Sequence, residues 1–102
     1  MSANPILLEA IALKKCISAT YNRVEMLLAP HILYSKNGAF YIDAVTIEKN
    51  GAPPRERKMG AFHLSGLSDV ALTEQHFERA GELFDPELPR YQDGATLFSI
   101  DG

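Results

Sequence analysis

The chain has 102 residues, of which 46% are hydrophobic and 23% are charged, and its formal net charge is -3. A chain of this length forms one domain with a modest core, and its average composition excludes a disordered polymer and a membrane-embedded class. The small negative charge argues against strong nonspecific binding to nucleic acid, because that affinity comes mainly from Lys and Arg displacing counterions.

Three further features bear on the compartment. Cys16 is the only cysteine, which excludes an internal disulfide and favours a reducing compartment. The amino-terminal segment has no cationic region before its apolar stretch and includes Glu9, so we expect no signal peptide. No apolar run approaches the roughly 18 to 20 residues that span a bilayer. We therefore expect a cytoplasmic protein without a membrane partner.

The first predicted element is a short helix that begins at Asn4. Asn4 is a favourable cap and Pro5 suits the first helical position, where a missing amide hydrogen does no harm. Leu7, Ala10 and Ile11 then recur at spacings of three and four residues. This spacing places them on one apolar face of the helix.

Two strands are predicted next. Residues 16–22, "CISATYN", are rich in residue types that favour strands, and residues 24–34 alternate between apolar and other side chains. Val24, Met26, Leu28, Ile32 and Tyr34 would form one apolar face of the second strand. Pro30 interrupts this pattern. Because proline has no amide hydrogen to donate to a ladder, it predicts a bend, a bulge or an edge.

The strongest local signal is the pair Asn37-Gly38, which lies between two apolar alternating runs. Both residue types tolerate a positive backbone φ, as a tight type I′ hairpin requires. The strand after the turn then has two faces, because side chains alternate with a period of two. The predicted core face is Phe40, Ile42 and Ala44, and the opposite face is Tyr41, Asp43 and Val45.

The second half of the chain is less regular. We expect an exposed loop in "EKNGAPPRER", a strand over residues 58–64 and a short closing strand in "SGLSDVALT". Thr73 can cap a helix over residues 74–84, which Pro86 and Pro89 would stop. The segment "ATLFSI", residues 95–100, fits either an added strand or an interface.

These elements predict a mainly β (α+β) fold, in which an N-terminal helix precedes five short antiparallel strands. Such a sheet is strongly bent, and its closure into a barrel would remove exposed edges. We expect residues 1–77 to form the domain and residues 78–102 to be a C-terminal extension packed on it.

The order of the helix, "ATYN", "LLAPHILYSKNGAFYIDAV" and "FHLSGLSDV" resembles the WYL domain family of bacterial regulatory proteins. Phe40-Tyr41-Ile42 stands where the family has Trp-Tyr-Leu, Pro30 matches its proline and Gly38 its turn glycine. The similarity covers residues 5–77. It implies a divergent, stand-alone member with a five-stranded Sm-like, SH3-type barrel, and a role in sensing a ligand or binding a partner in transcription regulation.

The chain departs from this family at its arginines, which are associated with nucleic acid or anionic ligands. The corresponding positions are Met26, Gly60, His63 and Gly66. The resemblance therefore does not by itself carry anion or nucleic-acid binding over to these positions. His63 retains partial cationic character, because an imidazole titrates near pH 6.5; the alternative is a histidine with no ligand.

The candidate ligand site is the strand face that Tyr41 and Asp43 share, joined by His63 from a later strand. Tyr41 and Asp43 can offer a donor and an acceptor to a ligand, and the resemblance makes this face the expected ligand surface. The alternative is a half-buried tyrosine whose hydroxyl is held by a carboxylate or water.

A second candidate site is the basic cluster Arg55, Arg57 and Lys58, which can contact phosphates or form only a solvated loop face. The three histidines share no ligand spacing, so we expect no metal, and no motif indicates a cofactor. No nucleophile and base form a familiar pattern, so we expect a non-catalytic protein.

Three functions follow in order of preference. The first is a WYL-like regulatory module that binds a small ligand or a protein partner through Tyr41, Asp43 and His63. The second is a homo-oligomer built from a sheet edge and residues 95–100. The third is a weak binder of single-stranded nucleic acid through Arg55, Arg57 and Lys58.

Overall fold

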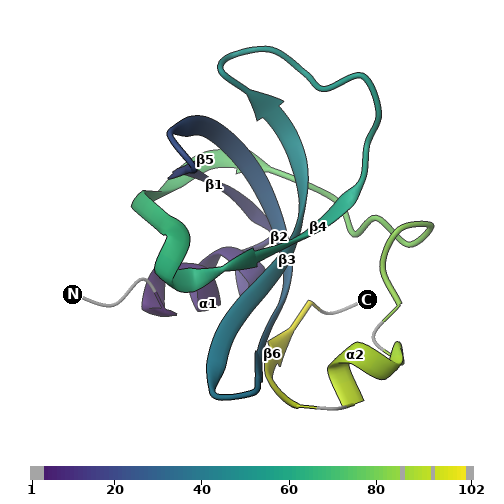
Figure 1. Ribbon diagram of the computed structural model, residues 1–102. Coiled ribbons are helices and arrows are strands. Elements are labelled where there is room, and N and C mark those ends of the chain that lie inside the picture. Colours follow the sequence, from purple (N-terminus) through teal and green to yellow (C-terminus); the bar gives the residue numbers. More distant parts are fainter. Residues whose placement is uncertain (1–3, 86, 93, 101–102) are drawn as a thin grey trace.

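The computed structural model describes residues 4–85, 87–92 and 94–100. It confirms a mainly β fold that begins with a helix (Figure 1). The elements in chain order are α1 (Asn4–Leu13), β1 (Lys15–Tyr21), β2 (Val24–Lys36), β3 (Ala39–Lys49), β4 (Met59–His63), the short 3-10 helix η1 (Leu64–Gly66), β5 (Leu67–His76), α2 (Pro89–Gln92) and β6 (Ala95–Ser99).

All strand pairs are antiparallel, and five strands follow one another in the order β4-β3-β2-β1-β5. Strand β2 is 13 residues long, so one of its edges has room for two partners. Its first part pairs with β1 and its last part, from Ile32 to Ser35, pairs with β6. The prediction of an added strand near the carboxyl end is therefore confirmed.

The sheet is strongly bent but it is not closed. Strands β4 and β5 are the two ends of the five-strand path, yet only the three residues of η1 separate them. So short a connection requires the two ends of the sheet to approach each other at this corner. No pairing between β4 and β5 is found within the described part of the chain, and the sheet has six strands in place of the predicted five.

The predicted hairpin is confirmed at Asn37-Gly38. Their φ angles are 53° and 78°, and Lys36 lies opposite Ala39, so these two residues form the whole connection between β2 and β3. Positive φ at both central residues matches the right-handed twist of the flanking strands. This turn sets the register of the longest strand pair in the sheet.

Pro30 marks a bulge, as predicted. Pro30 lies opposite Ala44, whereas Ile32 lies opposite Asp43, so His31 is an extra residue in β2. A bulge of one residue reverses which side chains face which side of the sheet. Leu28 and Ile32 consequently lie on opposite faces, and the single apolar face predicted for β2 is wrong.

Both faces of the sheet centre are covered, so the middle of β3 is buried on both sides. Ile42, Asp43, Ala44 and Val45 all have an exposed fraction of 0%. Helix α1 contributes Leu7, Ala10 and Ile11 to the larger core cluster, together with Ile17, Leu28, Ile42 and Phe62. The C-terminal segment, residues 77–100, supplies the remaining cover. Its Ala80 and Phe77 belong to a second cluster with Cys16, Ala29 and Val45.

Two predictions about side chains near the hairpin had different outcomes. Ile42 and Ala44 lie in the core as predicted, but Phe40 is 44% exposed. Phe40 is only the second residue after the turn, at the end of the sheet, where few neighbours can cover it. The predicted cap depends on the Asn4 side chain and one predicted helix stop depends on Pro86, and both lie outside the described part of the chain.

The helix predicted over residues 74–84 is wrong. Strand β5 extends to His76, where it lies opposite Lys15 of β1, and no helix is found in the described residues between His76 and Pro89. Pro89, predicted to stop a helix, is instead the first residue of α2. Long-range pairing with β1 has therefore prevailed over the local preference for a helix.

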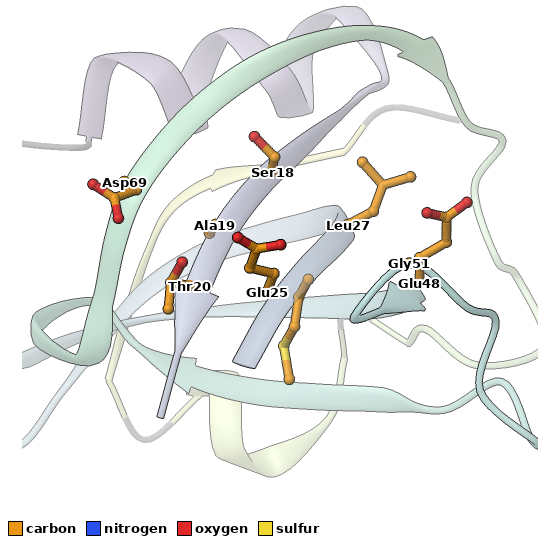
Figure 2. Close-up of a pocket in the computed structure, with 9 residues that line it drawn as sticks. Ser18, Ala19, Thr20, Glu25, Leu27, Glu48, Gly51 and Asp69 are labelled. Atoms are coloured by element: carbon orange, nitrogen blue, oxygen red, sulfur yellow. The ribbon is translucent and has the colours of Figure 1, made fainter. Parts of the chain in front are cut away.

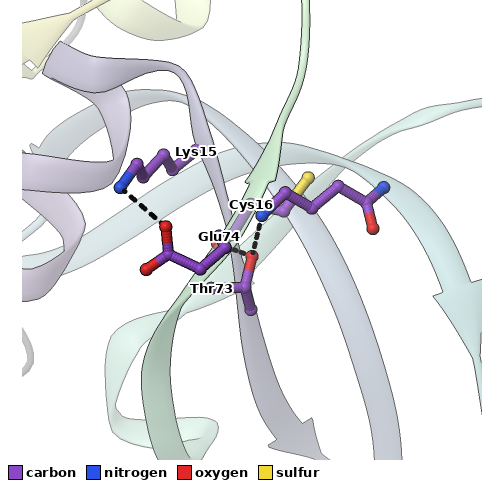
Figure 3. A network of polar contacts seen from close by, with 5 residues as sticks. Lys15, Cys16, Thr73 and Glu74 are labelled. Atoms are coloured by element: carbon purple, nitrogen blue, oxygen red, sulfur yellow. Dashed lines mark hydrogen bonds and ion pairs between the residues drawn. The ribbon is translucent and has the colours of Figure 1, made fainter.

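Contacts at the end of β5 explain this outcome (Figure 3). The Thr73 hydroxyl donates to the Cys16 carbonyl at 2.7 Å and accepts the Gln75 amide at 3.2 Å, and Lys15 lies 3.6 Å from Glu74. The Phe77 amide donates to the Lys14 carbonyl at 2.8 Å. The contacts with Lys14, Lys15 and Cys16 hold residues 73–77 beside β1, in an extended conformation.

We expect Gly38→Ala to lower the free energy of unfolding by about 1 kcal/mol, because an L side chain at positive φ meets its own backbone. A Cβ at Gly38 would meet nothing within 4 Å, so the effect isolates the φ of +78°. Gly81→Ala is the matched control, since it also has open space within 4 Å and its φ lies outside the left-handed region. Urea unfolding measures both. Equal effects of the two substitutions would contradict the assigned turn.

Candidate functional site

The structure brings two of the predicted ligand residues together. Tyr41 of β3 lies opposite His63 of β4, and their rings are 4.9 Å apart at 71°. Tyr41 also stacks on Tyr34 at 5.6 Å. The Nδ1 atom of His63 accepts the Ser65 amide at 3.2 Å and lies 2.7 Å from the Ser65 hydroxyl. One ring nitrogen of His63 therefore caps η1.

Asp43, the third predicted residue, lies inside the protein. Its exposed fraction is 0%, and its two carboxylate oxygens accept hydrogen bonds from different tyrosines. The Tyr34 hydroxyl donates at 2.8 Å and the Tyr91 hydroxyl at 2.5 Å. Because Tyr91 belongs to α2, these bonds join the C-terminal segment to the sheet. A ligand role for Tyr41, Asp43 and His63 stays a prediction, and neither of the two clefts described below is lined by them.

The three residues of the basic cluster are in different surroundings. Arg55 and Lys58 are exposed, and Lys58 lies 3.8 Å from Glu56 in an ion pair whose partners are 74% and 73% exposed. An ion pair this exposed contributes little to stability. Arg57 is exposed as well, but unlike the other two it lines a cleft.

This cleft, which we call the seam cleft, lies between the sheet and the start of the C-terminal segment. Its volume is about 440 Å³, a size that fits a small organic molecule. The sheet side contributes Cys16, Ile47, Gln75 and His76, and the other side contributes residues 77–80 and 82. Arg57 enters from the loop that precedes β4. The seam cleft is thus built from segments that are distant in the sequence.

Arg79 brings a buried hydrogen-bond donor to the seam cleft. Its Nε atom is buried and makes no hydrogen bond with the described residues. The central carbon of its guanidinium lies 5.4 Å from the centre of the Phe84 ring, which is cation–π geometry. A buried polar atom without a partner is rare in native proteins.

His31 joins the wall of the seam cleft to the sheet. It is fully buried, its Nδ1 lies 2.8 Å from the Ala29 carbonyl, and its Nε2 accepts the Ala80 amide at 3.0 Å. The ring lies between Phe77 and Phe84, with centroids 5.1 and 5.4 Å away. These bonds require a neutral imidazole with its hydrogen on Nδ1, since a carbonyl only accepts and an amide only donates.

The environment of His31 disfavours its protonated form. Burial lowers the pKa of His31 below its ordinary value of 6.5, the bond to the Ala29 carbonyl raises it, and the charges of Arg79 and Arg57 lower it. Sequence reasoning missed His31; its one signal was the neighbouring Pro30, which predicted an irregular strand.

Cys16, on the sheet side of the seam cleft, carries a neutral thiol. Burial raises the pKa of Cys16 to about 11, and the charge of Glu48 acts in the same direction. A thiol that stays protonated at neutral pH is a poor nucleophile. Cys16 thus adds an apolar surface to the cleft, and it is not a reactive thiol.

A second cleft, also of about 440 Å³, lies between β1, β2 and β5 (Figure 2). It differs from the seam cleft in charge, because three carboxylates and no cation line it. They belong to Glu25, Glu48 and Asp69. No group of three or more His, Cys, Asp or Glu within the described ranges is arranged to hold a metal ion.

Comparisons with protein-family models, with curated proteins and with solved structures found no match to this chain. Among residues 4–85, 87–92 and 94–100, no helix is long and apolar enough to cross a bilayer. The candidate site is therefore defined by geometry. The seam cleft is concave and mostly polar, it is lined by two arginines, and Cys16, Ile47 and Ala80 give it a smaller apolar part.

We expect the stability of the protein to decrease as the pH falls below 6.5, because of His31. The unfolded chain takes up a proton near pH 6.5, whereas burial keeps the folded ring neutral to a lower pH. The free energy of unfolding consequently falls with pH in that window, by at most about 1.4 kcal/mol per pH unit. Urea unfolding between pH 7.5 and 5.5 measures this slope.

His31→Gln should flatten the slope, whereas His76→Gln, at an exposed histidine, should keep it. Equal slopes in the wild-type protein and in His31→Gln would contradict the assigned role of His31.

Proposed function

We propose that this protein is a non-catalytic regulatory module of the WYL-like kind, and that it senses a small ligand bound in the seam cleft. The observation that carries this proposal is the position of the cleft, between the sheet and the C-terminal segment. A ligand bound there contacts both parts. It therefore stabilises the arrangement in which residues 77–82 lie against the sheet, as ligands stabilise the state that they bind.

The order of elements supports the WYL-like part of the proposal. The resemblance implies a helix followed by a five-stranded Sm-like barrel, and the chain has α1 followed by β1 to β5 with the two ends of the sheet joined by η1. Membership in this group also carries the proposed role in bacterial transcription regulation and the proposed cytoplasmic location. The neutral thiol of Cys16 supports a non-catalytic role for the seam cleft.

The positions of the cations also fit this function. Gly60 and Gly66 stand where the family has arginines, so β4 and η1 present no guanidinium there. Arg57 precedes β4 and Arg79 follows β5, and both line the seam cleft. Arg57 and Arg79 thus lie next to β4 and β5, although they occupy other sequence positions than the arginines of the family.

A homo-oligomer is the second candidate function. Strand β6 pairs with β2 along one edge, and its side chains Leu97 and Phe98 are 47% and 38% exposed. Exposed apolar residues on an edge strand favour contact with another chain. The nucleic-acid candidate has less support, because three cations give a weak electrostatic attraction and Glu56 lies beside Lys58 in an ion pair.

Native mass spectrometry of the protein purified from its source tests the proposed function. We expect a retained small molecule, and we expect Gln75→Trp to lose at least 90% of it, because a bulky ring at this exposed position of β5 fills the seam cleft. Ala71→Trp is the matched control, exposed on the same strand and outside both clefts.

Retention of the molecule by Gln75→Trp, or no retained molecule together with no thermal stabilisation by a metabolite panel, would refute the proposal. The same spectra report the copy number, and a monomer would eliminate the homo-oligomer.

A further inference from the structure

We propose that the ligand of the seam cleft carries an oxyanion, a carboxylate or a phosphate, which binds between Arg57 and Arg79. This inference rests on the proposed function and names the chemistry that the cleft selects. Three observations support it: an unused donor in the cleft, the charges around that donor and the small apolar part of the lining.

The unused donor is the Nε–H of Arg79. This atom is buried and has no hydrogen-bond partner in the described part of the chain. The Nε–H and one terminal N–H of a guanidinium form a fork that matches the two oxygens of a carboxylate or a phosphate. Water or a protein carbonyl can satisfy one donor of such a fork, whereas an oxyanion satisfies both.

The Phe84 ring supports the guanidinium of Arg79. Arg79 lies over this ring, with its central carbon 5.4 Å from the ring centre. A cation–π contact uses no hydrogen-bond donor, so it leaves the N–H groups of Arg79 available. Phe84 is itself buried, with an exposed fraction of 4%, so its ring is a fixed support.

Arg57 supplies the second cation. It lines the same cleft, and its charge acts on His31 in the same direction as that of Arg79. Glu78 and Glu82 also line the cleft, but neither forms an ion pair within 4 Å with either arginine among the described residues. Two cations that repel each other and have no such partner are stabilised by an anion placed between them.

The remaining walls limit the size and character of the ligand. The neutral thiol of Cys16 and the side chains of Ile47 and Ala80 can contact a short carbon skeleton. The volume of about 440 Å³ suits a small molecule. The two glutamates keep the whole cleft from being strongly basic, which disfavours a polyanion such as nucleic acid.

An NMR titration of the full chain tests this inference, with inorganic phosphate in one arm and succinate in the other, each at constant ionic strength. We expect saturable shifts of the Arg79 Nε–H and of the neighbouring Ala80 amide. Saturation with phosphate alone, with succinate alone or with both supports the inference and identifies the preferred oxyanion.

Three variants locate the bound anion. Arg79→Lys keeps the charge but loses the fork, and we expect at least tenfold weaker binding. Arg57→Gln, a change at an exposed residue that leaves the core intact, should weaken binding about fivefold. Arg55→Gln, in the same loop and outside the seam cleft, is the control and should bind as the wild-type protein does.

Shifts that grow linearly with concentration in both arms would overturn the inference, as would equal weakening by Arg57→Gln and Arg55→Gln. A second outcome separates the two proposals. If Gln75→Trp excludes a retained cellular ligand, but Arg57→Gln and Arg79→Lys bind it as tightly as the wild-type protein does, the oxyanion inference is wrong and the proposed function stands. No retained ligand together with no saturable titration would overturn both.

Discussion

The bulge in β2 is the feature on which the arrangement of the whole chain depends. Because one residue is inserted opposite β3, His31 contacts the C-terminal segment through both its side chain and its backbone. Its Nε2 accepts the Ala80 amide, and its carbonyl accepts the Ile100 amide at 2.8 Å. A single residue thus fixes two points of the segment that are 20 positions apart. The bonds from Tyr34 and Tyr91 to Asp43 add a third, buried connection.

These polar contacts give the segment one defined position. Apolar contacts alone, such as those of Phe77, Ala80 and Leu83, permit small shifts along a sheet, whereas a buried hydrogen bond tolerates little change in distance or angle. The seam cleft depends on this fixed position, because one of its walls contains Ala80, which His31 binds. Arg79 directly precedes Ala80, so the same bond that anchors the segment also places the guanidinium.

Much of the fold could be predicted, because the signals for it are local. Asn37-Gly38 specifies its own turn, Pro30 excludes a regular ladder at its position, and alternation identifies the strands before and after the turn. Residues 95–100 were correctly considered for an added strand. In each case the residues that specify the element lie within it, so no knowledge of distant partners is required.

The errors and omissions have the opposite origin, in contacts between distant parts of the chain. Residues 74–84 have local features of a helix, but residues 74–76 belong to β5, which pairs with the edge of β1. The sequence pattern does not reveal that this edge is available. Likewise Asp43 was expected at a ligand surface. The residue that covers its carboxylate, Tyr91, is 48 positions away, and no local pattern links the two. His31 and Ala80 are 49 positions apart, so the wall of the seam cleft was equally hidden.

Native-state hydrogen exchange at low denaturant most directly tests the claim that the bulge ties the C-terminal segment into one cooperative unit. The account predicts that the amides of Ala80 and Ile100 exchange only through the global unfolding that exposes the paired amides of β2 and β3, with the same denaturant dependence. Exchange of Ala80 and Ile100 through a smaller opening, while β2 and β3 stay protected, would contradict it.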